Sequence, residues 1–235
     1  MYKKKKIIAI IPARGGSKGI PNKNIKVICG KPLISWTIKE AKKCRLLDKI
    51  VVTTDSTRIA DISVRCGAQV PFLRPKYLAS DSSSMLPVVL HVLDFFEKNK
   101  EPYDIYVLLQ PTSPLRSYKD IAGSIKSLFK KDADTVVSVT EASCHPFWMN
   151  TIPNNGSMRG FLNPAAKNKN RQDLPRYFQV NGAVKAGFIN SLKEHKGFFT
   201  EKTYAYVMPK ERSVDIDNKI DFDFATLLLH EKLKK

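Results

Sequence analysis

The stretch that decides the fold runs from residue 10 to residue 24 and reads IIPARGGSKGIPNKN. It starts inside an apolar run, Ile7 to Pro12, and passes directly into a loop with three glycines and the cations Arg14, Lys18 and Lys23. Glycines let a backbone approach an anion closely, and cations offset the roughly four negative charges of a nucleoside triphosphate. Ligands of open α/β sheets bind at the carboxyl ends of the strands, so this stretch predicts a nucleotide-phosphate site there. Taken without its neighbours, it could equally be a plain basic turn.

Apolar runs and amphipathic runs alternate along the first 140 residues. The further strands expected to be buried on two faces cover residues 50–54, 105–109 and 135–139. Helical spacing covers residues 32–44, 85–97, the segment from the Ser117/Asp120 capping box to about Lys130, and 219–233. This alternation predicts one α/β domain over residues 1–235, with a Rossmann-like, mostly parallel sheet and helices on both faces. Short segments rich in Pro, Asn and Gly predict an irregular excursion over residues 143–181.

Composition excludes several classes of protein. The four cysteines show neither paired nor metal-site spacing, which predicts free thiols and a cytoplasmic location. No apolar stretch reaches the roughly 20 residues that cross a bilayer, so no membrane span is expected. The net charge of +18 is spread along the chain, which favours anionic small substrates or a lysine-rich surface over a nucleic-acid partner.

Two aspartates near the end of the chain form a candidate metal site. Asp215 and Asp217 alternate around Ile216, so an extended strand would present both carboxylates on one face. Mg²⁺ in proteins is held by one or two carboxylates together with substrate phosphate. An isolated Asp-x-Asp is more often a solvated acidic turn.

The stretch at residues 10–24 resembles the signature of the acylneuraminate cytidylyltransferases. Further matches follow in order: VTTDS at 52–56, LRP at 73–75 with LASD at 78–81, LLQPTSPLR at 108–116, RQDLP at 171–175, NGA at 181–183 and SVDID at 213–217. Because these matches keep their order from about residue 7 to residue 217, the chain is identified as a member of this family.

The resemblance implies a reaction and its participants. CMP would pass from CTP to the anomeric hydroxyl of a nonulosonic acid (sialic, legionaminic or pseudaminic type), with Mg²⁺ as cofactor and pyrophosphate as the leaving group. Family members are commonly homodimers, and the excursion would then reach the edge of a partner's active site. Two alternatives stay open: a cytidylyltransferase for the acid KDO, which should lack RQDLP and NGA, and a non-enzymatic nucleotide- or nucleic-acid-binding protein.

The resemblance also implies roles for individual residues. Arg14 and Lys23 would hold phosphates, while Asp217, as metal ligand or base, would share Mg²⁺ with Asp215; a metal-bound hydroxide is the other candidate base. The substrate-binding residues would be Gly15, Ser17, Asn24, Arg74, Asp81, Ser82, Gln110, Arg171, Gln179 and Asn181. Among these, Gln110 and Arg171 would orient the sugar.

Two departures from the sialic acid branch bear on which sugar is used. Phe147 and Trp148 stand near a position where bacterial sialic acid enzymes tend to carry a lysine, and Gln179 stands where an arginine is familiar. A less polar pocket, with His145 at its edge, predicts legionaminic or pseudaminic acid, because buried unpaired hydroxyls are costly. Alternatively, Trp148 faces the core and Lys167 or Lys169 supplies the missing charge.

Overall fold

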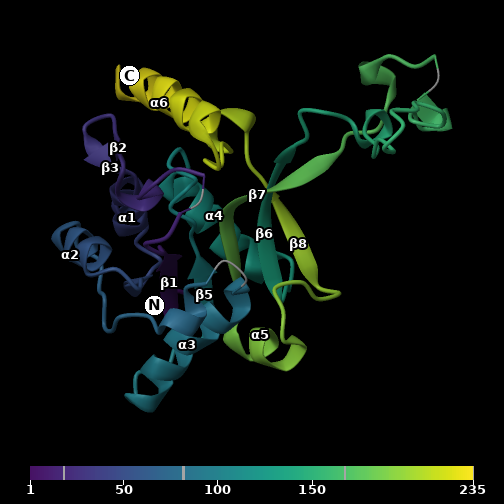
Figure 1. The fold of residues 1–235 in the computed structure, drawn as a ribbon. Coiled ribbons are helices and arrows are strands. Elements are labelled where there is room, and N and C mark those ends of the chain that lie inside the picture. Colours follow the sequence, from purple (N-terminus) through teal and green to yellow (C-terminus); the bar gives the residue numbers. More distant parts are fainter. Residues whose placement is uncertain (18, 81–82, 167, 235) are drawn as a thin grey trace.

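The computed structural model describes residues 1–17, 19–80, 83–166 and 168–234, with Arg171 described for its backbone alone. Within this range a six-stranded sheet forms in the order β4-β1-β5-β7-β6-β8 (Figure 1). The strands are β1 (Ile7–Pro12), β4 (Lys49–Thr53), β5 (Ile105–Leu108), β6 (Thr135–Glu141), β7 (Phe178–Phe188) and β8 (Thr203–Val207). β1 pairs parallel with β4 and β5, and β6 pairs parallel with β8, whereas β7 is antiparallel to both of its neighbours. The predicted mostly parallel sheet is confirmed.

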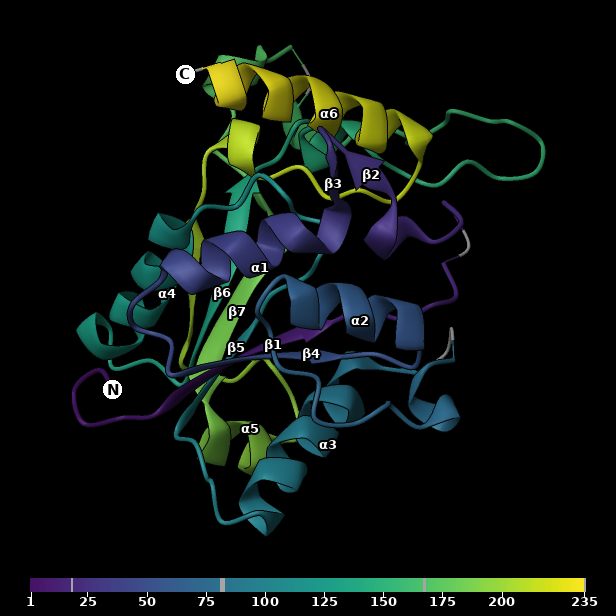
Figure 2. The same cartoon turned by 90° about the vertical axis from the view of Figure 1, so that its left-hand side faces the viewer.

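Alternate side chains of β1 pack on opposite layers of helices. Ile7, Ala9 and Ile11 belong to one core cluster with residues of α1, α2 and α4, while Ile8 and Ile10 belong to a second cluster with residues of α3 and α5. The helices are α1 (Leu33–Lys43), α2 (Thr57–Arg65), α3 (Met85–Lys98), α4 (Tyr118–Lys130) and α5 (Ile189–His195). Figure 2 shows α1 and α2 on one face of the sheet and α3 and α5 on the other. A strand covered on both faces needs apolar side chains throughout, which explains the unbroken run IIAIIP.

A further layer lies outside α1 and is formed by a helix and a short hairpin. Helix α6 (Lys219–Lys234) packs with the short hairpin of β2 (Val27–Ile28) and β3 (Lys31–Pro32), and it buries Phe222, Ala225 and Leu229. Leu233, at the same helical spacing, is exposed, so the buried stripe ends at Leu229. The N-terminus of α6 directly follows the two aspartates, which ties this helix to the acidic segment.

Between β6 and β7 the chain leaves the sheet as an arm, defined here as residues 143–176 (Figure 1). The Ala142 amide donates to the Tyr177 carbonyl at 2.9 Å and closes the base of the arm. In its described residues the regular structure consists of short 3₁₀ turns: η3 (Pro146–Trp148), η4 (Pro164–Ala166) and η5 (Arg171–Asp173). β7 begins at Phe178, before the predicted boundary at residue 181, because residues 178–180 pair with β6.

The remaining 3₁₀ turns lie near the carboxyl edge of the sheet; they are η1 (Lys23–Ile25), η2 (Lys76–Leu78) and η6 (Lys210–Arg212). Across the described ranges, no helix combines the length and the apolar character needed to span a bilayer.

Candidate active site

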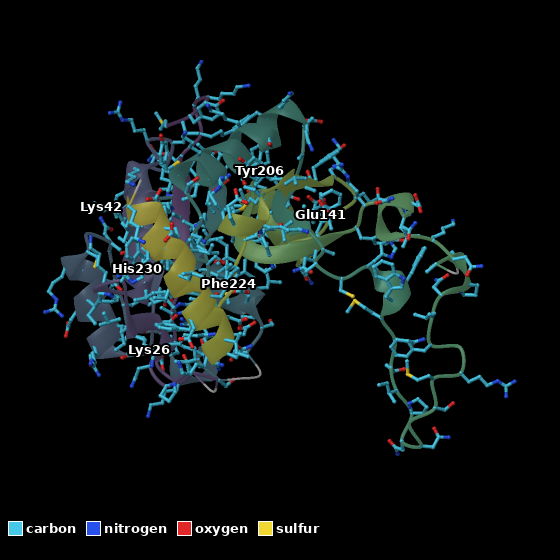
Figure 3. All side chains as sticks on the ribbon, turned by 90° about the horizontal axis from the view of Figure 1, so that it is seen from above. Lys26, Lys42, Glu141, Tyr206, Phe224 and His230 are labelled. Atoms are coloured by element: carbon cyan, nitrogen blue, oxygen red, sulfur yellow. The ribbon has the colours of Figure 1, made fainter. Side chains whose placement is uncertain are left out.

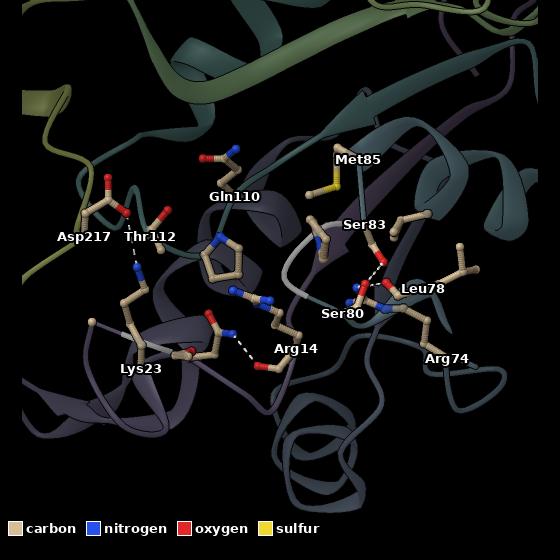
Figure 4. Close-up of a pocket in the computed structure, with 16 residues that line it drawn as sticks. Arg14, Lys23, Arg74, Leu78, Ser80, Ser83, Met85, Gln110, Thr112 and Asp217 are labelled. Atoms are coloured by element: carbon tan, nitrogen blue, oxygen red, sulfur yellow. Dashed lines mark hydrogen bonds and ion pairs between the residues drawn. The ribbon is translucent and has the colours of Figure 1, made fainter. Parts of the chain in front are cut away.

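A cleft of about 400 Å³ opens at the carboxyl ends of β1 and β5. Its walls come from the loop after β1, the segment from η2 to the start of α3, the loop after β5, and the segment before α6. Figure 4 shows Arg14 near the middle, with Lys23 and Asp217 at one end and Ser83 and Met85 at the other. The cleft therefore lies where the sequence places the phosphate loop.

Seven of the predicted site residues line this cleft. They are Arg14, Ser17, Lys23, Asn24, Arg74, Gln110 and Asp217. Lys18, Asp81 and Ser82 lie outside the described residues. Among the residues that the structure describes, three lining cations against one lining carboxylate make the cleft suited to a polyanion such as a nucleoside triphosphate.

Contacts within the loop after β1 decide what its glycines do. The Asn24 side-chain amide donates to the Arg14 carbonyl at 3.0 Å and fixes the loop. The Gly15 amide donates to the Asp55 carboxylate at 2.9 Å, so this amide is bound by the protein itself rather than directed at an anion. Gly19 packs against the Asp217 carbonyl with no room for a Cβ. Gly19 thus allows the phosphate loop to pack closely against the acidic segment.

Arg74 forms part of the wall rather than a mobile surface cation. It is 6% exposed, and its guanidinium donates to the carbonyls of Thr53 and Leu78. Burial lowers the pKa of Arg74, while Asp55 opposes this shift and Arg14 adds to it. Arg74 therefore holds the turn before α3 and contributes positive charge from a fixed position.

Gly182 brings a side-chain amide and a carboxylate together. Its φ is +68°, and an added Cβ would lie 2.5 Å from Gln110 Oε1 and 3.1 Å from Asp215 Oδ2. Sequence reasoning quoted this glycine within NGA but gave it no role. An Asn-Gly pair is a known signal for a left-handed residue and could have identified it.

Asn181 is predicted to bind substrate, but its side chain does not line the cleft. It is buried, and its Oδ1 accepts from Ser138 Oγ at 2.6 Å and from the Ala183 amide at 3.2 Å. Its Nδ2 donates to Ser213 Oγ at 2.9 Å. This amide joins β6, β7 and the segment that leads to Asp215, so it supports the site from below.

The acidic segment is not a strand, contrary to the expectation that both carboxylates share one face of a strand. Ile216 is fully buried and its amide donates to the Thr112 carbonyl at 2.9 Å, which anchors the segment. The Asp217 side chain is 79% exposed, and Lys23 Nζ lies 3.3 Å from its Oδ1 and donates to the Ile216 carbonyl at 2.6 Å.

Asp215 has a more buried carboxyl group than Asp217. Burial raises the pKa of Asp215; the Thr112 hydroxyl and Lys23 favour its ionised form, and Asp217 opposes it. Within the described part of the chain, its buried Oδ1 has no hydrogen-bond partner. An oxygen of this kind is suited to a ligand that brings positive charge.

A fit test for Mg²⁺ rests on these two carboxylates. Among the described residues, no group of three or more His, Cys, Asp or Glu is arranged to hold a metal ion. Mg²⁺ commonly uses only one or two carboxylates and completes its shell with water and substrate phosphate. The unpaired oxygen of Asp215 and the exposed carboxylate of Asp217 fit that donor set.

The predicted sugar-side residues in the arm and at the start of β7 are not among the described residues that line this cleft. Arg171 belongs to η5, and Gln179 is exposed near the start of β7. Phe147 and Trp148 pack around the His145 ring, whose Nε2 lies 3.1 Å from the Pro175 carbonyl. The expectation that these rings wall the sugar pocket is not met within one chain, because the arm carries them away from the body. Trp148 does not face the main core either, contrary to the alternative given in the sequence analysis. Lys167, which that alternative offered as a source of the missing charge, lies outside the described residues.

An open α/β sheet with a cationic cleft and a carboxylate pair at its carboxyl edge defines a nucleotidyltransferase type of site. The family model for cytidylyltransferases matches residues 8–230. The chain therefore belongs to the cytidylyltransferase family and is an enzyme of the nucleotidyltransferase class.

Curated relatives match the chain over most of its length. It is 36% identical over 231 residues to CMP-N,N'-diacetyllegionaminic acid synthase of Legionella pneumophila, covering 95% of this chain and 96% of that protein. It is 30% identical over 223 residues to pseudaminic acid cytidylyltransferase of Campylobacter jejuni, covering 95% and 96%. It is 38% identical over 219 residues to N-acylneuraminate cytidylyltransferase of Streptococcus agalactiae, covering 92% of this chain and 52% of that protein. The chain thus spans about half the length of the last relative.

A solved structure shares the fold. CMP:2-keto-3-deoxy-manno-octonic acid synthetase complexed with CTP matches with a TM-score of 0.72 at 16% identity, covering 97% of this chain and 99% of that one. At this identity the likeness supports the fold alone.

Proposed function

We propose that this protein transfers CMP from CTP to the anomeric hydroxyl of a nonulosonic acid and releases pyrophosphate. The observation that carries the proposal is the match, over 95% of the chain, to a legionaminic acid and a pseudaminic acid enzyme. The cationic cleft supports the nucleotide half of the reaction. The KDO alternative is less supported: the KDO enzyme reported above shares the fold at 16% identity.

In this proposal the cleft acts mainly by positioning and charge. Arg14 and Lys23 bind the phosphates of CTP and stabilise the departing pyrophosphate through charge-assisted hydrogen bonds. Lys23 would exchange its contact with Asp217 for phosphate oxygens, and Asp217 and Asp215 are the residues that would hold Mg²⁺. When bound, Mg²⁺ supplies neutralisation of the charge that develops on the α-phosphate. Gln110 holds the sugar in line with the α-phosphorus.

A homodimer would complete the sugar side of the site. The arm extends away from the body of the protein (Figure 3). It exposes apolar side chains that a solvated arm does not need: Met149, Ile152, Met158 and Leu162 are between 56% and 63% exposed. Exposed apolar surface of this kind is typical of interaction sites. Arg171 and Gln179 would then act at the edge of the partner's cleft. Light scattering tests this: Ile152→Asp with Met158→Asp should give a monomer, and a monomeric native protein refutes the dimer.

A reducing, cytoplasmic compartment fits the thiols. All four cysteines are free, and Cys44 is buried without a partner thiol in the described part of the chain. We infer that the reaction takes place where CTP is available and disulfides do not form.

The function is tested by measuring pyrophosphate release in a coupled assay. CTP, Mg²⁺ and a panel of N-acetylneuraminic, legionaminic and pseudaminic acids and KDO are supplied in turn. We expect release only with CTP, the metal and a nonulosonic acid together, and Arg14→Ala should abolish most of it. No release with any nonulosonic acid, a preference for KDO, or equal turnover with ATP would refute the proposal.

A further inference from the structure

The LLQPTSPLR segment ends in a buried cation that sequence reasoning left without a role. Arg116 is 1% exposed and sits beneath the loop that carries Gln110. Placing a guanidinium in the interior is costly unless hydrogen bonds and opposite charges compensate. The contacts of Arg116 therefore indicate what the chain gains by burying it.

Those contacts join three elements that are distant in sequence. Arg116 Nη1 donates to the Gln110 carbonyl at 3.1 Å and to the Ala183 carbonyl at 2.6 Å. Nη2 donates to Thr37 Oγ1 at 2.7 Å, on α1. One nitrogen thus links the end of β5 to β7 directly after Gly182.

The link sets the spacing between Gln110, which lines the cleft, and the more buried Asp215. Gln110 Oε1 and Asp215 Oδ2 both lie close to Gly182, with no room for even a Cβ at Oε1. If the backbone of β7 moves relative to Gln110, the side-chain amide and the carboxylate lose their common support.

The charges around Arg116 agree with this geometry. Asp120, Glu40 and Asp215 attract the guanidinium, and although burial lowers the pKa of Arg116 to about 10, the group stays charged at neutral pH. Asp120 in turn accepts from Arg212 Nε and Nη2 at 3.0 and 2.9 Å, at the end of the turn that precedes Asp215. The loop with Gln110 and the acidic segment are therefore held from one buried cluster.

We propose that Arg116 is a positioning residue: it fixes Gln110 and Asp215 relative to each other and does not touch CTP. This rests on the proposed function. Its loss impairs the chemical step and the use of the sugar, while the affinity for CTP, which depends on Arg14, Lys23 and Arg74, is preserved.

The test is Arg116→Lys, which keeps a positive charge but loses the planar fork that reaches two carbonyls and a hydroxyl. We expect kcat to fall on the order of tenfold to a hundredfold, the range for misplacement approaching 1 Å. The Kd for CTP, measured by calorimetry without sugar, should stay within about threefold because ground-state nucleotide contacts remain. Thr37→Val keeps the shape of the side chain but removes the hydroxyl that accepts from Arg116 Nη2 and donates to the Gln110 carbonyl at 3.5 Å. It should lower kcat in the same direction, so this variant tests the proposal if Arg116→Lys does not fold.

Leu128→Ala is the matched control, because Leu128 is fully buried in α4 and packs in the core rather than in the cleft. It should lower the Tm with little change in kcat. An equal loss of kcat in Leu128→Ala at a similar Tm, or native kcat in both Arg116→Lys and Thr37→Val, overturns the proposal. A wild-type enzyme that transfers CMP to no acid refutes the proposed function first, and this proposal with it.

Discussion

Replacing Gly182 by alanine should damage the site more than the fold. The backbone at this position has φ +68°, and the added Cβ would lie 2.5 Å from Gln110 Oε1. Ordinary contact begins at 3.4 Å, so the amide must move by the difference, about 0.9 Å. Misplacement of about 1 Å can cost about a hundredfold in rate, which is the fall in kcat we expect.

The loss of folding stability expected from Gly182→Ala is smaller than its effect on the site. A non-glycine residue in the left-handed region costs about 1–2 kcal/mol. For a chain of 235 residues, at about 2–4 °C per kcal/mol, this corresponds to a fall in Tm of about 2–8 °C. Circular dichroism melts and steady-state kinetics on the same sample separate the two effects.

Gly30→Ala supplies the control. Gly30 has φ +74° in the turn between β2 and β3, and an added Cβ there would meet nothing within 4 Å. It should lose a similar amount of stability and keep its kcat. Native turnover in Gly182→Ala, or an equal loss of turnover in Gly30→Ala, would show that crowding of Gln110 is not what Gly182 prevents.

Three further predictions concern the acidic pair and the sugar. Asp217→Ala should lower kcat by about a hundredfold or more at limiting Mg²⁺, with unchanged circular dichroism, because a metal ligand acts mainly in the transition state; near-normal turnover contradicts its role. Burial raises the pKa of Asp215, so the folded state binds this proton more tightly than the unfolded chain, and stability falls as pH rises from the usual aspartate range through the raised value. Asp215→Asn should therefore raise the Tm at neutral pH, lose activity, and show no gain in Tm at a pH below the usual aspartate range; a lower Tm at neutral pH would be the contrary result. Comparison of kcat/KM should favour legionaminic or pseudaminic acid over N-acetylneuraminic acid, and the reverse order would overturn the substrate assignment without affecting CMP transfer.

Helices and strands that a local sequence pattern specifies could be predicted. β1 was predicted at its observed bounds, Ile7–Pro12, since burial on both faces requires an unbroken apolar run. The helix after Ser117 was predicted from its capping box, and the structure contains both reciprocal hydrogen bonds with Asp120. Strand β8 was not predicted. It lies at the edge of the sheet, and its exposed Tyr204 and Val207 leave a weak apolar signal.

The site was predictable where one residue acts through its own chemistry, and less so where its role depends on distant partners. Arg14 and Lys23 are cations beside glycines, so their place in the cleft could be anticipated from the loop alone. The engagement of the Gly15 amide by Asp55 depends on a contact across 40 positions of sequence. The bond from Arg116 to Ala183 spans 67 positions, and no local pattern reports it.

The hydrogen bond at the base of the arm bears on how this protein can diverge. Because Ala142 and Tyr177 are already adjacent, the arm begins and ends at nearly one point, and the entropy of closing a loop depends only weakly on its length. Insertions, deletions or exchange of residues 143–176 leave the pairing of β6 with β7 in place. In the function and the dimer proposed above, sugar preference and subunit contacts could therefore change by exchange of this one segment, while the cleft at the edge of the sheet keeps its geometry.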